Sequence, residues 1–167
     1  MKLYLTFFST LLFLSNSYFA QFVQSKSYNV MLKTLLSHKV KEISAKDAKR
    51  DSTALFLDAR EKKEFNVSHL KHATWVGYDD FDMTRVQTIP KDKKIIVYCS
   101  VGFRSEKITE KLVKAGYTNV SNVVGGIFEW KNLGYSVVDP TGKETDKIHA
   151  YSKTWGIWLN KGEKIYN

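Results

Sequence analysis

Residues 94–105 read KIIVYCSVGFRS, and this stretch decides the fold. Its first half, 94–99, is a continuous apolar run of the kind found in strands that are buried on both faces of a parallel sheet. A short loop containing Gly102 follows, and residues 105–115 then carry apolar side chains at helical spacing. The stretch therefore predicts a strand–loop–helix unit of an open sheet, in which ligands bind at the carboxyl ends of the strands.

Further strands and helices are predicted to alternate on either side of this unit. The predicted strands are 40–43, 54–58, 73–76 and 119–124, and the predicted helices are 30–36, 45–49, 61–65 and 127–132. This alternation favours an α/β fold with three layers, in which helices cover both faces of a central parallel sheet of about five strands.

Cys99 is the candidate nucleophile, because the predicted strand delivers it to the carboxyl edge of the sheet, just before a helix begins. Backbone amides of the loop, the helix N-terminus and Arg104 would favour the thiolate there, and the thiolate is the reactive form. The alternative is an inert thiol in the core. Arg104 is expected at the rim of the loop, where it would stabilise the anionic substrate or persulfide and add little stability to the fold. The alternative is that it only pairs with a surface acid.

Four motifs occur in the order that is typical of one family. In chain order they are Leu57-Asp58-Ala59-Arg60, Glu64-Phe65 with His69-Leu70 and Ala73, Cys99–Ser105, and Val124-Gly125-Gly126-Ile127 with Trp130, Gly134-Tyr135 and Val137. On these motifs the chain resembles rhodanese-like domains over about residues 38–139. Two positions depart from the family pattern, because Ser68 and His72 stand where glycines are usual.

The resemblance implies a rhodanese-type sulfurtransferase in which Cys99 carries sulfur as a persulfide. The sulfur would come from a small anion such as thiosulfate and pass to cyanide, a thiol or a protein acceptor. The alternative is a non-catalytic binding or sulfur-relay module that recognises a partner protein. No metal or organic cofactor is expected.

The remaining site residues follow from the same resemblance. Residues expected to bind substrate are Ser100, Val101, Gly102, Phe103, Arg104, Ser105 and Arg60, whereas Asp58, His69, Gly125 and Gly126 are expected to be structural near the site. For Arg60 two alternatives remain open: its side chain faces the pocket, or it has a purely structural role. A phosphatase is disfavoured, because such enzymes carry one more residue between the cysteine and the arginine.

The first twenty residues have the pattern of a secretory signal peptide, with Lys2, an apolar run over 3–14 and small polar residues before Ala20. The sequence thus predicts an exported protein, periplasmic or secreted, with no stable membrane insertion after cleavage. An uncleaved anchor or a buried helix is the alternative. A lone cysteine excludes an internal disulfide.

The formal net charge is +9, and the lysines are scattered singly along the chain. We therefore expect a solvated basic surface and no nucleic acid partner. We also expect a monomer. The predicted divisions are a signal peptide at 1–20, a leader with a short helix at 21–37, the rhodanese-like domain at 38–139 and an aromatic-rich extension at 140–167. The extension carries Tyr151, Trp155, Trp158 and Tyr166. We expect these rings to form a packed cover, with a ligand cage as the alternative.

Overall fold

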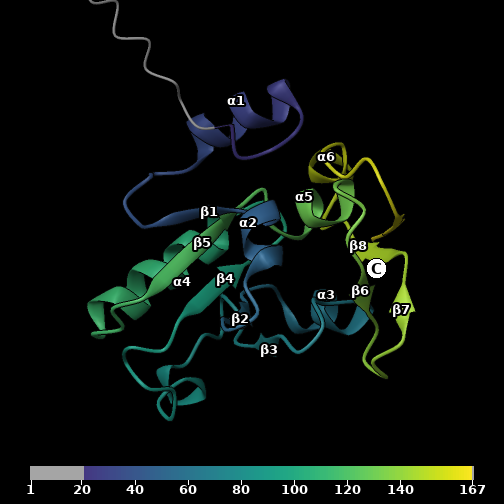
Figure 1. Cartoon of the computed structure of the whole chain (residues 1–167). Coiled ribbons are helices and arrows are strands. Elements are labelled where there is room, and N and C mark those ends of the chain that lie inside the picture. The colour runs from purple at the N-terminus through teal and green to yellow at the C-terminus, as the bar shows by residue number, and fades with distance from the viewer. Residues whose placement is uncertain (1–20, 167) are drawn as a thin grey trace, which may run out of the picture.

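The computed structural model describes residues 21–166. Five parallel strands form the central sheet in the order β1-β5-β4-β2-β3 (Figure 1). Their bounds are Glu42–Ser44 for β1, Leu55–Asp58 for β2, Thr74–Trp75 for β3, Ile95–Tyr98 for β4 and Val120–Val124 for β5. The predicted α/β fold with a central parallel sheet of five strands is confirmed.

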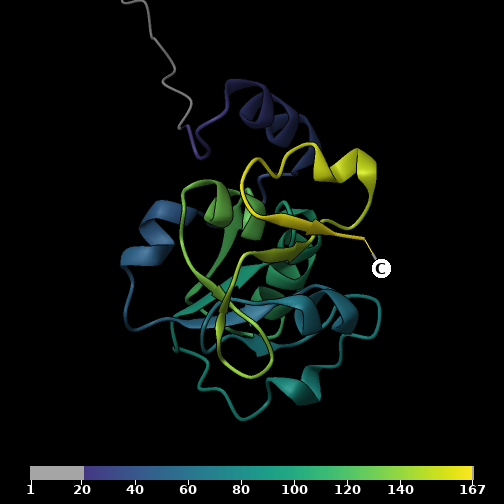
Figure 2. The same ribbon diagram turned by 90° about the vertical axis from the view of Figure 1, so that its right-hand side faces the viewer.

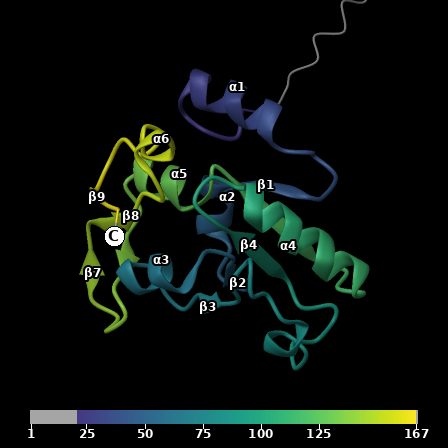
Figure 3. The ribbon, with the colours of Figure 1, turned by 180° about the vertical axis from the view of Figure 1, so that it is seen from behind.

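Helices cover both faces of the sheet. Helix α4 (Phe103–Lys114) lies on one face, and α2 (Ala45–Arg50) and α5 (Gly126–Asn132) lie on the other (Figures 1 and 3). Side chains of β4 alternate between the two cores, with Ile95 and Val97 facing α4. Every residue of β4 is buried, which is why this strand reads as an unbroken apolar run.

Shorter elements complete the chain. They are α1 (Lys26–Leu35), α3 (Lys62–Val67), the 3₁₀ helix η1 (Met83–Arg85), β6 (Val137–Val138), β7 (Glu144–Thr145), β8 (Lys147–His149), α6 (Lys153–Gly156) and β9 (Glu163–Ile165). Strand β6 pairs with β7 in antiparallel fashion, and β8 pairs with β9 in parallel.

Helix boundaries follow local capping. The Ser44 hydroxyl accepts a hydrogen bond from the Asp47 N–H at 3.0 Å and begins α2, as predicted. Ser25 caps α1 in the same way, so this helix begins four residues before the predicted start, within the segment expected to be a polar leader. The apolar periodicity located the helix, but only its second half.

The C-terminal extension packs onto the sheet domain rather than away from it. Ile148, Ala150 and Leu159 are fully buried in the same core as α2 and α5. Trp158 stacks on Tyr28 of α1, with 5.1 Å between ring centroids. Figure 2 shows the yellow extension lying between α1 and the rest of the domain. The extension and α1 therefore belong to one packed structure.

The predicted signal peptide at 1–20 lies outside the described residues. Among residues 21–166, no helix combines the length and the apolar character that crossing a membrane requires.

Replacing a buried isoleucine of the extension tests its contribution to the core. We expect Ile148→Ala to lower the free energy of unfolding by about 2–5 kcal/mol, because it removes fully buried methyl groups and leaves a cavity. The matched control is Ile157→Ala, whose side chain is exposed. Urea denaturation of both variants measures the difference. Equal stability of the two would contradict a shared core.

Candidate functional site

Cys99 follows β4 directly, at the carboxyl edge of the sheet, and its side chain is almost fully buried. The N–H of Gly102 donates to Cys99 Sγ at 3.1 Å. Gly102 is also the N-cap of α4, so the first turn of this helix begins beside the sulfur. A backbone donor and the positive end of a helix dipole both stabilise a negatively charged sulfur.

The junction between β5 and α5 is hydrogen-bonded to the backbone of the cysteine loop. The N–H of Ile127 donates to the Cys99 carbonyl at 2.8 Å, and the N–H of Gly125 donates to the Val101 carbonyl at 3.0 Å. A Cβ on Gly126 would collide with the Cys99 carbonyl oxygen, and the φ of Gly126 is +53°. These contacts explain why the first residue of α5 is a glycine.

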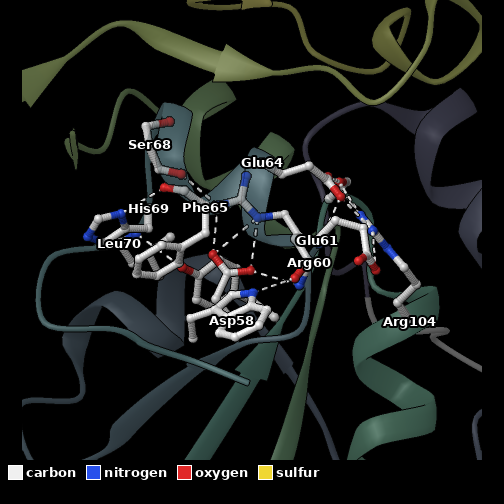
Figure 4. Close-up of polar contacts among 12 residues, drawn as sticks. Asp58, Arg60, Glu61, Glu64, Phe65, Ser68, His69, Leu70 and Arg104 are labelled. Carbon is white, nitrogen blue, oxygen red and sulfur yellow. Dashed lines mark hydrogen bonds and ion pairs between the residues drawn. The ribbon is translucent and has the colours of Figure 1, made fainter. Parts of the chain in front are cut away.

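Arg104 is locked into the frame of the site. Its guanidinium donates to both carboxylate oxygens of Glu64, at 2.6 and 2.8 Å, and to Ser100 Oγ at 2.9 Å (Figure 4). The Ser100 hydroxyl donates in turn to Glu64 at 3.0 Å. The expectation of an arginine at the rim that adds little stability is therefore wrong, since these bonds tie α3 to the cysteine loop.

Burial and charge compete at Glu64, whose side chain has no solvent exposure. Burial alone would raise its pKa, but the hydrogen bonds and charge of Arg104 outweigh burial and hold the pKa below the ordinary value. Glu64 is thus a buried carboxylate that stays ionised because its cation is fixed beside it.

Arg60 and Asp58 form a separate buried pair. Arg60 donates to both oxygens of Asp58 and, at 2.6 Å, to the Ser68 carbonyl. Neither side chain is exposed to solvent, and neither lines the pocket described below. Of the two alternatives for Arg60, its side chain in this structure faces Asp58 and the Ser68 carbonyl and not the pocket.

Other predicted residues lie around the loop without entering the pocket. The Ser105 hydroxyl donates to Asn122 Oδ1 at 2.6 Å, and the ring of His69 stacks on Phe65, at 3.8 Å between centroids. The sequence reasoning missed Asn122, which also donates to the Gly102 carbonyl at 3.0 Å. Its signal in the sequence was an amide side chain at the centre of β5, a strand whose every residue is buried.

A pocket of about 300 Å³ opens at Cys99. Cys99, Ser100, Val101, Phe103 and Arg104 of the cysteine loop line it, whereas Gly102 and Ser105 do not. Further lining residues come from elsewhere in the chain. Leu35, Glu61, Tyr78 and Asp79 were not predicted, whereas Tyr151 and Trp155 belong to the aromatic set for which a ligand cage was the alternative. Two of these are aromatic residues of the C-terminal extension, so this part of the chain contributes directly to the pocket.

A sequence model of the rhodanese-like domain matches residues 40–133 of the chain. The chain belongs to the rhodanese-like domain family. Solved structures agree in fold. A rhodanese-like domain from Anabaena superposes with a TM-score of 0.51 and 22% identity, covering 57% of this chain and 72% of that one. A Bacillus halodurans protein reaches 0.54 and 21%, covering 68% and 84%.

Curated relatives of this rhodanese-like domain carry a specific enzyme name. A tRNA uridine(34) hydroxylase of Hamiltonella defensa is 36% identical over 140 residues, which is 78% of this chain and 35% of that protein. A protein of the same name from Enterobacter is 34% identical over 85 residues, which is 48% of this chain and 24% of that protein. The chain thus covers about a third or less of these relatives.

These relatives correct the functional interpretation of the sequence. They are enzymes, which supports the general prediction that this chain is an enzyme but not the predicted activity. Their name contradicts a thiosulfate sulfurtransferase, because it specifies hydroxylation of a uridine. The same name contradicts the alternative of a non-catalytic binding or sulfur-relay module. The cysteine loop determines the position of the thiol and the groups that stabilise its negative charge, but it does not determine the substrate.

The relatives also correct the predicted partner and location. They are named for an activity on tRNA, which contradicts the expectation that no nucleic acid is bound. The same name contradicts export to the periplasm or medium. The scattered lysines were interpreted as a solvated surface, although a net charge of +9 equally suits a phosphate backbone.

Gly126 offers a direct test of the loop contact. We expect Gly126→Ala to destabilise the protein by at least about 2 kcal/mol, because a Cβ would add a backbone collision to the cost of a left-handed conformation. Gly116→Ala is the control, since Gly116 also has a positive φ but nothing within 4 Å of an added Cβ. Thermal and urea unfolding compare them. Equal losses would contradict the role of the close approach.

Arg104→Met should lower the free energy of unfolding by about 3–5 kcal/mol at neutral pH, because it leaves the Glu64 carboxylate buried without its cation. The double variant Glu64→Gln with Arg104→Met should recover part of this loss. Denaturation curves give both values. A single variant as stable as the wild type would show that solvent reaches Glu64.

The same pair predicts a pH dependence. The pKa of Glu64 is lower in the folded than in the unfolded protein, so its stabilisation is complete above about the ordinary value of 4.5. That stabilisation is lost as the pH falls through the folded-state pKa. Urea denaturation across this range should therefore show a smaller acid-induced loss in Glu64→Gln than in the wild type. Identical pH profiles would contradict the assignment.

Proposed function

We propose that this rhodanese-like domain is an enzyme that oxidises a uridine base of tRNA, with Cys99 as the group that reacts with the base. The similarity to the Hamiltonella defensa hydroxylase supports the proposal, because its 140 residues extend beyond the stretch that the family model matches. The similarity to this hydroxylase is therefore longer than the stretch that the family model covers.

The observation that carries the proposal is the composition of the pocket. A cysteine with a backbone donor on its sulfur shares a cavity with four aromatic side chains, Tyr78, Phe103, Tyr151 and Trp155. Enzymes that modify a base take it out of the stack and hold it between aromatic or apolar side chains. The net charge of +9 suits a polyanionic substrate.

Covalent catalysis by Cys99 suits the chemistry of uracil. The carbon at position 6 of the ring is electron-poor, because it is conjugated to a carbonyl group. Attack by the thiolate forms an S–C6 bond and moves an electron pair toward C5, which then becomes nucleophilic. The C5 carbon attacks one oxygen of a peroxide, whose O–O bond breaks and releases the other oxygen as hydroxide, so that C5 carries a hydroxyl group. Loss of the C5 proton then restores the C5–C6 double bond and expels the thiolate. The Gly102 N–H stabilises the thiolate before the attack and after its release.

Cys99→Ser should reduce hydroxylated uridine by at least about a hundredfold, because a serine hydroxyl is a far weaker nucleophile and leaving group than a thiolate. The assay incubates purified protein with tRNA lacking the modification, in air with a thiol reductant or with hydrogen peroxide. Mass spectrometry of the nucleosides measures the product.

The control is the folded state of the variant, followed by thermal unfolding, and Ser52→Ala serves as an exposed substitution away from the pocket. Full hydroxylation by Cys99→Ser would remove Cys99 from the mechanism. If wild-type protein forms no hydroxylated uridine with either oxidant, the proposed function is wrong.

A further inference from the structure

The C-terminal extension places a conformationally unusual tyrosine at the mouth of the pocket. Tyr151 has a φ of +64°, which non-glycine residues rarely adopt, and its side chain is 51% exposed. The N–H of Ser152 donates to the Ala150 carbonyl at 2.8 Å, which closes a tight three-residue turn around Tyr151. Residues in such conformations occur often at ligand sites, where the surrounding structure holds them.

Two neighbours hold Tyr151 in this turn. Its N–H donates to His149 Nδ1 at 3.1 Å, and His149 itself is buried at the end of β8. Its ring lies over the guanidinium of Arg104, with 5.0 Å between the guanidinium carbon and the ring centroid. Arg104 is fixed in turn by Glu64. The ring is therefore oriented before any ligand arrives, and half of its surface is still accessible.

A second exposed ring at the pocket comes from a different element of the fold. Phe103, the first residue of α4, is 37% exposed and lines the same cavity as Tyr151. Exposed large aromatic side chains are otherwise rare among the described residues, where Tyr166 is the one further example. Two of these three rings thus border the cavity that contains Cys99.

We propose that Tyr151 and Phe103 are a stacking site for one unpaired pyrimidine base, so that the C-terminal extension selects single-stranded RNA for the Cys99 pocket. This inference rests on the proposed function and assigns its substrate-selecting residues. Stacking on aromatic rings suits any base in a single strand, whereas a paired base has no free face.

Glu61 adds a preference for uracil. Its Oε1 atom is buried and has no hydrogen-bond partner, and the residue lines the pocket 4.0 Å from Arg104 Nη1. Uracil presents an N3–H donor that a carboxylate oxygen accepts, whereas cytosine presents a lone pair at N3. Glu61 Oε1 has an ion-pair contact with Arg104 but accepts no hydrogen bond, so it can accept one from uracil N3–H, which favours uracil over cytosine.

The test measures binding of a short fluorescent oligouridine by anisotropy at fixed salt, using the full chain with Cys99→Ser so that no reaction follows. Tyr151→Leu should weaken binding by roughly five- to hundredfold, the range of one base–aromatic stack. Tyr151→Phe should retain binding, because it keeps the ring. Tyr166→Leu is the matched control, an exposed tyrosine of the same extension that does not line the pocket.

Base preference provides a second readout. The wild-type pocket should bind oligouridine more tightly than oligocytidine, and Glu61→Gln should reduce this preference, because an amide can also donate to N3 of cytosine. Thermal unfolding of each variant verifies that it is folded. Binding that is equal in Tyr151→Leu and wild type, or equal for duplex and single-stranded RNA, would overturn the inference.

The outcomes separate this inference from the proposed function. If Tyr151→Leu weakens oligouridine binding but the wild-type protein forms no hydroxylated uridine, the stacking site is supported and the proposed reaction is refuted. Hydroxylation with the same KM for RNA in Tyr151→Leu would refute the stacking site and leave the reaction standing. Absence of any oligouridine binding would overturn the inference.

Discussion

The buried carboxylate of Glu64 is the contact on which the geometry of the site depends. It joins α3 to the cysteine loop through Arg104 and Ser100, at distances between 2.6 and 3.0 Å. A charge without solvent is tolerated only where its partners are fixed, so each group of this network constrains the others. Arg104 is thereby held in one orientation, and it is the surface over which Tyr151 lies.

Much of the fold could be predicted because its central strands are buried on both faces. Such strands are mostly apolar, so β2, β4 and β5 stand out in the sequence, and β4 most clearly because every one of its residues is buried. The cysteine loop that follows β4 stands out as well. The partner of Arg104 could not be predicted, because Glu64 lies forty positions away and only the tertiary fold brings them together. The start of α1 was missed because polar residues of its first turns hide the periodicity.

The pocket illustrates why the motif did not determine the reaction. Residues 99–104 supply a stabilised sulfur, which several chemistries can use. The other wall consists of residues with no motif, among them Glu61, Tyr78 and Trp155. Substrate choice depends on the shape and polarity of that wall, and these depend on contacts between distant segments. A sequence pattern around the nucleophile contains no information about them.

Within the extension, burial separates two groups of aromatic side chains that look equivalent in the sequence. Trp158 stacks on Tyr28 and joins α1 to the core, as a packed cover would. Tyr151, seven residues earlier, sits in a left-handed turn and points its ring at the cavity side of Arg104. The first ring stabilises the position of the extension, and the second depends on that position to reach the pocket. Stability and recognition are therefore coupled through a short segment, because the same chain that buries Ile148 also orients Tyr151.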